Sequence, residues 1–98
     1  MATCLFSPQA RRDLLAIYNY IAEDSPSHAA RFVDLLEEKC GMIAESPGIG
    51  RRRPRLGKGV RSLPFGDYII FYNAIANGVE IRLILHAKRG ITGFLLRD

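Results

Sequence analysis

The 98-residue sequence contains no tryptophan and only two cysteines and two histidines. Cys4 and Cys40 are too few and too widely spaced for a disulfide framework or for a CxxC redox or zinc motif. Neither His28 nor His86 lies at metal-ligand spacing from a cysteine, so the sequence predicts no metal site and no cofactor. We expect both cysteines to be small buried side chains in a reducing compartment.

Long apolar runs are also absent. No window approaches the roughly 18 apolar residues that a membrane span requires. Residues 1–6 are too short for a signal peptide, and no apolar run follows them. We therefore expect a cytoplasmic protein with no membrane partner. The hydrophobic content of 48% and the absence of repeats predict a single globular domain over residues 1–98.

Acidic residues are missing from one basic stretch. The whole chain carries a net charge of +4, but the basic excess is concentrated in residues 51–61. Three interpretations of this stretch stay open: a solvated loop, a contact with nucleic-acid phosphates, or a contact with an acidic protein surface. No aromatic residue is interleaved with the cations, so stacking on single-stranded bases is not indicated. The cations are Arg51, Arg52, Arg53, Arg55, Lys58 and Arg61.

Two Ser-Pro pairs, Ser7-Pro8 and Ser25-Pro26, predict the starts of two helices. Each pair places a capping hydroxyl before a proline that suits the first helical turn. Apolar residues follow at helical spacing, and the second stripe stops at Ser46-Pro47-Gly48. The link between the helices is so short that they must form an antiparallel hairpin. The stripes are Ala10, Leu14, Ile17, Tyr18 and Ile21, then Ala29, Phe32, Val33, Leu36, Cys40 and Ile43.

Residues 3–6 predict one strand, and residues 60–86 predict three antiparallel strands joined by tight turns at Gly66-Asp67 and Asn77-Gly78. If Asn77-Gly78 is a two-residue loop, Ala76 pairs with Val79. A one-residue slip would exchange the two faces of the last strand. In this register, the face that should receive the helix hairpin carries Val79, Ile81, Leu83 and Leu85, with Leu63, Tyr68, Ile70 and Tyr72 beside them.

The opposite, mixed face would then carry Arg82 and His86 together with Ile84, and Lys88 and Arg89 lie just beyond. His86 has two interpretations: a general acid or base, or a strand-end side chain whose ring bonds to neighbouring backbone. With no partner nucleophile or carboxylate, we assign no catalytic residue. The predicted fold class is α+β in the order β-α-α-β-β-β, with the helix hairpin on one face of a small, mostly antiparallel sheet.

The segments RSLPFGDYIIFY and EIRLILHAKR, supported by FSPQARRDLLAIYNYIA, resemble the ParE branch of the RelE/ParE superfamily. These proteins are the toxin halves of bacterial toxin–antitoxin pairs, and the resemblance spans nearly the whole chain. It implies the RelE/ParE fold and a toxin that poisons DNA gyrase by binding, without chemistry of its own. It also implies neutralisation by a ParD-like antitoxin whose disordered arm folds along the toxin. Direct nucleic-acid contact is compatible with this function but not required.

Two other functions stay open. A RelE-like, ribosome-dependent mRNA endoribonuclease would use His86, Arg82 and Arg61. That branch commonly carries an aromatic residue, often tyrosine, near the C-terminal end. Here the only aromatic residue after His86 is Phe94. A toxin-fold protein without toxicity would act only as an antitoxin partner. The apolar residues of the tail predict an antitoxin contact or docking on the chain's own sheet: Ile91, Phe94, Leu95 and Leu96.

Overall fold

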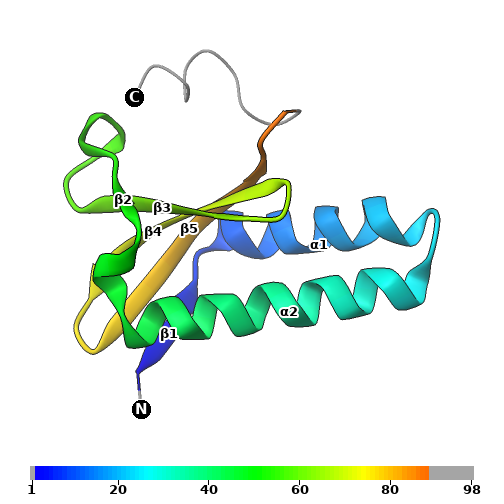
Figure 1. The fold of residues 1–98 in the computed structure, drawn as a ribbon, viewed down its shortest axis with the longest axis horizontal. Coiled ribbons are helices and arrows are strands. Elements are labelled where there is room, and N and C mark those ends of the chain that lie inside the picture. The colour runs from blue at the N-terminus through cyan, green and yellow to red at the C-terminus, as the bar shows by residue number, and fades with distance from the viewer. Residues whose placement is uncertain (1, 89–98) are drawn as a thin grey trace.

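The computed structural model describes residues 2–88, in which two helices lie against one face of a five-stranded sheet (Figure 1). The predicted α+β class and the order of the main elements are confirmed. The structure adds a two-residue strand and two short 3-10 helices. In chain order the elements are β1 (Thr3–Phe6), α1 (Pro8–Ala22), α2 (Pro26–Glu45), η1 (Pro47–Ile49), β2 (Arg51–Arg52), η2 (Pro54–Leu56), β3 (Val60–Phe65), β4 (Tyr68–Ile75) and β5 (Gly78–His86).

Both helices begin where the Ser-Pro pairs predict. The Ser7 hydroxyl accepts the N–H of Ala10 at 3.0 Å, and the Ser25 hydroxyl accepts the N–H of His28 at 3.2 Å. Each cap satisfies a backbone donor that has no partner within the helix. The predicted stripes supply most of the buried helical residues, which are Ala10, Ile17, Ala29, Leu36, Cys40, Ile43 and Ala44.

The sheet has the order β1-β5-β4-β3-β2, so the first strand pairs with the last. β1 runs parallel to β5 and the other neighbours are antiparallel, which confirms a mostly antiparallel sheet. The predicted turn at Gly66-Asp67 is also confirmed: Phe65 pairs with Tyr68, and Gly66 has a φ of 58°. A positive φ is readily adopted by glycine because it has no Cβ.

The second tight turn lies one residue earlier than predicted. Ile75 pairs with Gly78, so the two-residue loop is Ala76-Asn77 and the predicted pairing of Ala76 with Val79 is wrong. Asn77 takes the left-handed conformation, with a φ of 61°. Gly78 is instead the first residue of β5, where it lies so close to β1 that a Cβ would overlap the backbone of Thr3.

The pairing of β4 with β5 shifts by one residue in the middle of the strands. Tyr72 pairs with Ile81 and Phe71 with Leu83, which leaves Arg82 as the extra residue of a β-bulge. Side chains alternate along a strand, so each residue of β5 after the bulge faces the side opposite to the predicted one. Ile84 is therefore the residue that is buried under the helices, with 2% of its surface exposed.

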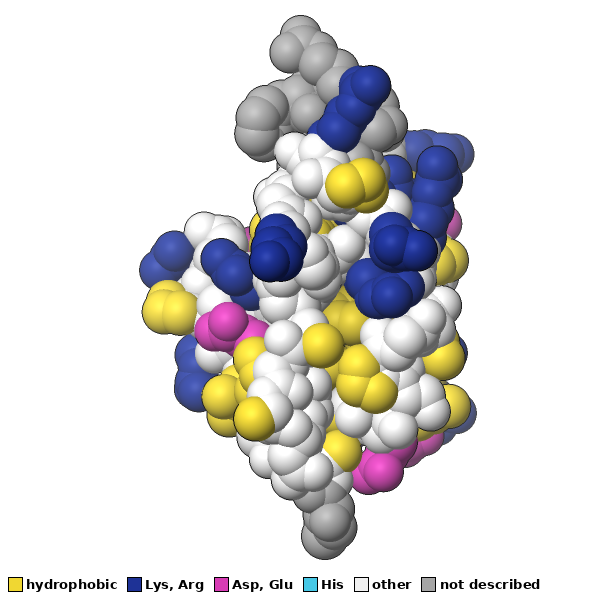
Figure 2. All heavy atoms as spheres, turned by 90° about the vertical axis from the view of Figure 1, so that its left-hand side faces the viewer, with side chains coloured by type: hydrophobic (Ala, Val, Ile, Leu, Met, Phe, Trp, Pro, Cys, Tyr) yellow, Lys and Arg dark blue, Asp and Glu magenta, His cyan; other side chains and the backbone are white. Residues whose placement is uncertain are grey.

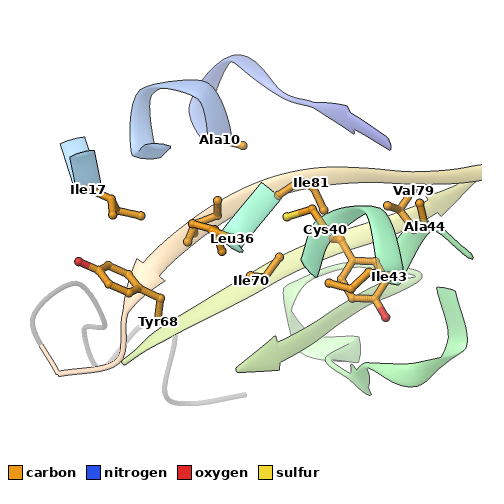
Figure 3. Packing of buried hydrophobic residues seen from close by; sticks show 12 residues of the cluster. Ala10, Ile17, Leu36, Cys40, Ile43, Ala44, Tyr68, Ile70, Val79 and Ile81 are labelled. Atoms are coloured by element: carbon orange, nitrogen blue, oxygen red, sulfur yellow. The ribbon is translucent and has the colours of Figure 1, made fainter. Parts of the chain in front are cut away.

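The prediction that Leu83 and Leu85 lie under the helices is accordingly wrong, and both are only half-buried. The placement of Ile84 and His86 on the mixed face is wrong for the same reason. The other residues predicted to face the helices do so: Val79, Ile81 and Ile70 are buried, and Leu63 packs against them. Tyr68 and Tyr72 are both buried in the core. In Figure 3, Leu36, Cys40 and Ile43 of α2 lie over side chains of β4 and β5, including those of Ile70, Val79 and Ile81.

The N-cap of α1, Ser7, and a side chain within the helix, Asp13, bind the backbone of β5 at and beside the bulge. β1 ends at Phe6, so the later part of β5 has no strand on that side. The Ser7 hydroxyl donates to the Arg82 carbonyl at 2.7 Å, and Asp13 Oδ2 accepts the N–H of Ile84 at 2.9 Å. These two bonds satisfy backbone groups that a neighbouring strand would otherwise pair.

Both cysteines are free thiols, and Cys40 is fully buried whereas Cys4 is half-buried. Burial, with smaller contributions from the nearby Cys4 and Glu37, raises the pKa of the Cys40 thiol from 9.0 to about 12. Burial, with a smaller contribution from Glu37, also raises the pKa of Cys4. The expectation of small buried thiols is confirmed for Cys40 and holds in part for Cys4.

We expect the pKa of Cys40 to make folding sensitive to alkaline pH. The thiol ionises near pH 9 in the unfolded chain and near pH 12 in the folded one, so its stabilising contribution is full below pH 9 and lost as pH rises toward 12. Between pH 7 and pH 10 the wild type should lose roughly 1–2 kcal/mol of unfolding free energy that Cys40→Ala does not lose. Urea unfolding of both proteins at both pH values measures this difference, and equal losses would contradict it.

Candidate functional site

A hollow of about 760 Å³ is bounded by the start of α1, the loop around η2 and the face of β4 and β5 opposite the helices. Its floor is apolar and includes Phe71 and Leu83, which pair across the two strands. Among the described residues no Asp, Glu or His lines it. Its charged side chains are all cations from three separate segments: Arg12, Arg55, Lys58 and Arg82.

Asn73 connects two of these segments. Arg82 Nη1 donates to Asn73 Oδ1 at 3.1 Å, and Asn73 Nδ2 donates to the carbonyl oxygen of Lys58 at 3.2 Å. One amide thus holds both the guanidinium of β5 and the loop that carries Lys58. Arg12 is held from its own helix, because its Nη2 donates to Gln9 Oε1 at 3.0 Å.

The bulge separates Arg82 from His86, which the predicted register places on one face. In the predicted register Arg82 and His86 share one face of β5, two steps of the alternation apart. In the structure Arg82 keeps the face opposite the helices and lines the hollow, whereas the bulge turns His86 to the helix side. The sequence therefore identifies Arg82 as a candidate but wrongly places His86 on the same face.

The six cations of residues 51–61 do not form one surface. Only Arg55 and Lys58 line the hollow, whereas Arg51 and Arg52 are exposed on β2. Arg53 Nε donates to the Ser62 hydroxyl at 2.8 Å. Figure 2 views the side of the molecule on which β2 and η2 lie, and shows Lys and Arg side chains gathered on the upper half of that face.

Arg61, the sixth of these cations, has a structural role. Its Nη1 donates to the carbonyl oxygen of Gly50 at 2.9 Å and reaches that of Gly48 at 3.4 Å. The buried Tyr72 hydroxyl binds the same segment, accepting the N–H of Gly50 at 2.8 Å and donating to the Pro47 carbonyl at 2.7 Å. Together they fix the chain that leads into β2 and η2.

Sequence reasoning missed Arg12, the fourth cation of the hollow. Its position in the first helix, off the apolar stripe, is that of an ordinary solvated side chain. Only the folded chain shows that the start of α1 lies beside the bulge of β5, where the Ser7 hydroxyl meets the Arg82 carbonyl.

His86 lies on the helix side of the sheet. Its ring packs edge-to-face on Tyr68, with centroids 5.1 Å apart, and its Nδ1 accepts the backbone N–H of Lys88 at 3.1 Å. These contacts agree with the interpretation of His86 as a strand-end side chain bonded to neighbouring backbone. A second, smaller hollow of about 230 Å³ lies here, lined in part by Asp13 and Tyr20.

The remaining predicted site residues lie at or beyond the end of the described chain. Lys88 is exposed, whereas Arg89 and the tail residues Ile91, Phe94, Leu95 and Leu96 fall outside the described residues. Their contact with an antitoxin stays a prediction. Within residues 2–88 no group of three or more His, Cys, Asp or Glu is placed to hold a metal ion, and no helix has the length and apolarity to cross a membrane.

Comparisons with a protein-family model and with individual proteins all identify toxins as similar to this chain. Residues 4–91 match the family described as the ParE toxin of the type II toxin–antitoxin system parDE. Toxin RelE1 of Caulobacter vibrioides is 34% identical over 88 residues, covering 86% of this chain and 91% of the relative. Toxin ParE1 of the same organism is 33% identical over 81 residues, covering 82% of this chain and 83% of the relative.

The structural comparison agrees with the sequence comparison on the fold. A chain of the chromosomal ParDE toxin–antitoxin system from P. aeruginosa superposes with a TM-score of 0.74, covering 90% of this chain and 98% of that chain. The two chains are 23% identical, so this likeness shows the fold alone. The similar toxins carry both the names RelE and ParE, and the names therefore do not distinguish the two targets.

Proposed function

Because this chain belongs to the family of ParE toxins of type II toxin–antitoxin systems, we propose that it acts in the cytoplasm by binding and inhibiting DNA gyrase. We further propose that a cognate ParD-like antitoxin neutralises it. In this function the toxin contributes a binding surface and catalyses no reaction of its own.

The observation that supports binding over catalysis is the separation of three side chains. A RelE-like nuclease would need His86, Arg82 and Arg61 together, as acid or base and as cations for the phosphorane charge. Here His86 packs on Tyr68 on the helix side, Arg82 faces the hollow, and Arg61 binds the carbonyl of Gly50. No joint site forms from these three residues.

The cationic hollow is the observation that favours a second candidate, a ribosome-dependent mRNA endoribonuclease. Four cations suit the phosphates of RNA as well as those of DNA. The described lining, however, contains no carboxylate or imidazole that would move a proton near neutral pH. We therefore favour the gyrase inhibitor.

We expect the purified toxin to block supercoiling by gyrase and to leave mRNA intact in a translation extract. His86→Ala should inhibit gyrase as strongly as the wild type, because inhibition by binding needs no general acid or base. Supercoiling gels and primer extension on the mRNA, run on the same preparations, measure both activities. Cleaved mRNA that disappears with His86→Ala would establish the nuclease instead. A toxin inert in both assays that still binds its antitoxin would show an antitoxin partner without toxicity.

A further inference from the structure

We propose that the hollow between α1, η2 and β5 binds the phosphate backbone of single-stranded DNA, so that the toxin contacts the DNA of the gyrase complex and not gyrase alone. The inference rests on the proposed function for the identity of the DNA. The binding chemistry itself follows from the charges, the hydrogen bonds and the size of the hollow.

The first argument is electrostatic. Cations from three segments converge on one hollow, and no carboxylate among the described residues lines it. A cleft lined by one sign of charge over apolar walls concentrates its field and attracts ions of the opposite sign. Three of the four cations are arginines, whose planar guanidinium matches two phosphate oxygens at once. The four are Arg12, Arg55, Lys58 and Arg82.

The second argument is preorganisation. Asn73 holds the guanidinium of Arg82 and the backbone of Lys58 at the same time. The Ser7 hydroxyl holds the carbonyl of Arg82, and Gln9 holds the guanidinium of Arg12. Groups that are already ordered lose less conformational entropy when an anion binds. These bonds make the hollow a formed site and not a set of independent surface cations.

The third argument concerns which parts of a nucleic acid the hollow can recognise. Its volume of about 760 Å³ is that of a small-ligand cleft, which accommodates part of one nucleic-acid strand. Phe71 is 4% exposed, so it offers no open ring face for stacking a base. The amide of Asn73 is occupied at both ends, and Gln9 Nε2 donates to Asp13 Oδ1 at 2.7 Å. Both amides are thus oriented by protein partners and not by a sugar, which disfavours recognition of a 2′-hydroxyl.

The expected ligand is therefore a phosphodiester backbone, which the hollow binds without distinguishing the base or the sugar. Such a site binds DNA and RNA strands of equal length with similar affinity. In the proposed function, the ligand of the hollow is DNA because the toxin binds the gyrase–DNA complex. An acidic peptide, whose carboxylates have a different spacing and geometry, should bind much less well.

The test measures binding of the full-length toxin to a fluorescent oligothymidylate of about 12 nucleotides between roughly 50 and 200 mM salt. Each cation that contacts a phosphate contributes about 0.7 to the slope of log affinity against log salt. Arg82→Gln and Lys58→Gln should each reduce the slope by about that amount. Arg31→Gln, an exposed position on α2 outside the hollow, is the matched control and should leave the slope unchanged.

Asn73→Ala separates positioning from charge. It keeps every cation, so the slope should stay at the wild-type value while the affinity falls at every salt concentration. Thermal unfolding by circular dichroism verifies that each variant is folded. Equal slopes for the hollow variants and the Arg31→Gln control would overturn the inference. So would an oligoglutamate that competes as well as DNA of equal charge, because the hollow would then be a site for acidic protein.

The same variants keep this inference distinct from the proposed function. If the wild type binds the oligonucleotide through the hollow but does not inhibit gyrase, the proposed function fails and the phosphate site stands. If the wild type inhibits gyrase and Arg82→Gln inhibits it equally well, the hollow plays no part in poisoning and the inference fails. If Arg82→Gln weakens both oligonucleotide binding and gyrase inhibition while folded, both proposals are supported.

Discussion

Replacing Gly78 by valine is expected to prevent stable folding. A Cβ at this position would overlap the carbonyl oxygen of Thr3, and the nearest atoms are all backbone. Backbone cannot move aside as a flexible side chain can, so the parallel pairing of β1 with β5 would have to separate. We expect a loss of about 3 kcal/mol or more, a large share of the total stability of a domain of this size.

Gly41→Ala is the matched control for that experiment. Gly41 lies within α2, and a Cβ there would meet nothing within 4 Å. Alanine is the better helix former, so this variant should gain roughly 0.5–1 kcal/mol. Urea unfolding followed by circular dichroism compares both variants with the wild type. A Gly78→Val protein with the wild-type midpoint would show that β1 does not pair with β5 as described.

The second large effect concerns the β-bulge. Ile84 lies beneath the helices with 2% of its surface exposed, whereas Leu83 is half-buried on the opposite face. Ile84→Ala should therefore cost about 2–5 kcal/mol, because it leaves a cavity in the core. Leu83→Ala removes a side chain of equal size from a partly solvated position and should cost roughly 1 kcal/mol.

The comparison of these two variants tests the register directly. Without the bulge, side-chain alternation would bury Leu83 and expose Ile84, and the order of the two stabilities would be reversed. Denaturant midpoints of the two variants, measured at one temperature and pH, decide between the registers. A Leu83→Ala protein that is less stable than Ile84→Ala would contradict the bulge.

Local sequence patterns predict much of this fold. Ser7 and Ser25 cap the helices as expected, since a hydroxyl before a proline-started helix meets a donor within three residues. Gly66 takes the positive φ that its turn requires. Such features depend on neighbours in the chain, and so the helix hairpin, the three-strand meander and the family were all accessible before the structure.

The candidate site was predictable only in part. The basic stretch contains Arg55 and Lys58, and the strand pattern identified Arg82, all of which line the hollow. The same stretch also supplied Arg61, whose guanidinium binds the backbone of the Gly48–Gly50 segment and has no role in the hollow. Charge alone does not distinguish these uses, because a carbonyl oxygen and a phosphate oxygen both accept from a guanidinium.

The sequence by itself determined the order of the elements, the helix ends, most of the core and the membership of the toxin family. The tertiary structure alone decided which cations meet. The bulge that turns Ile84 and His86 to the helix side is bound by Ser7 and Asp13, which are 75 and 71 residues away from their partners in the chain. Alternation along β5 carries no information about bonds that α1 makes to its edge. The face of each later residue of β5, and the place of Arg12 beside Arg82, therefore follow from packing between distant segments.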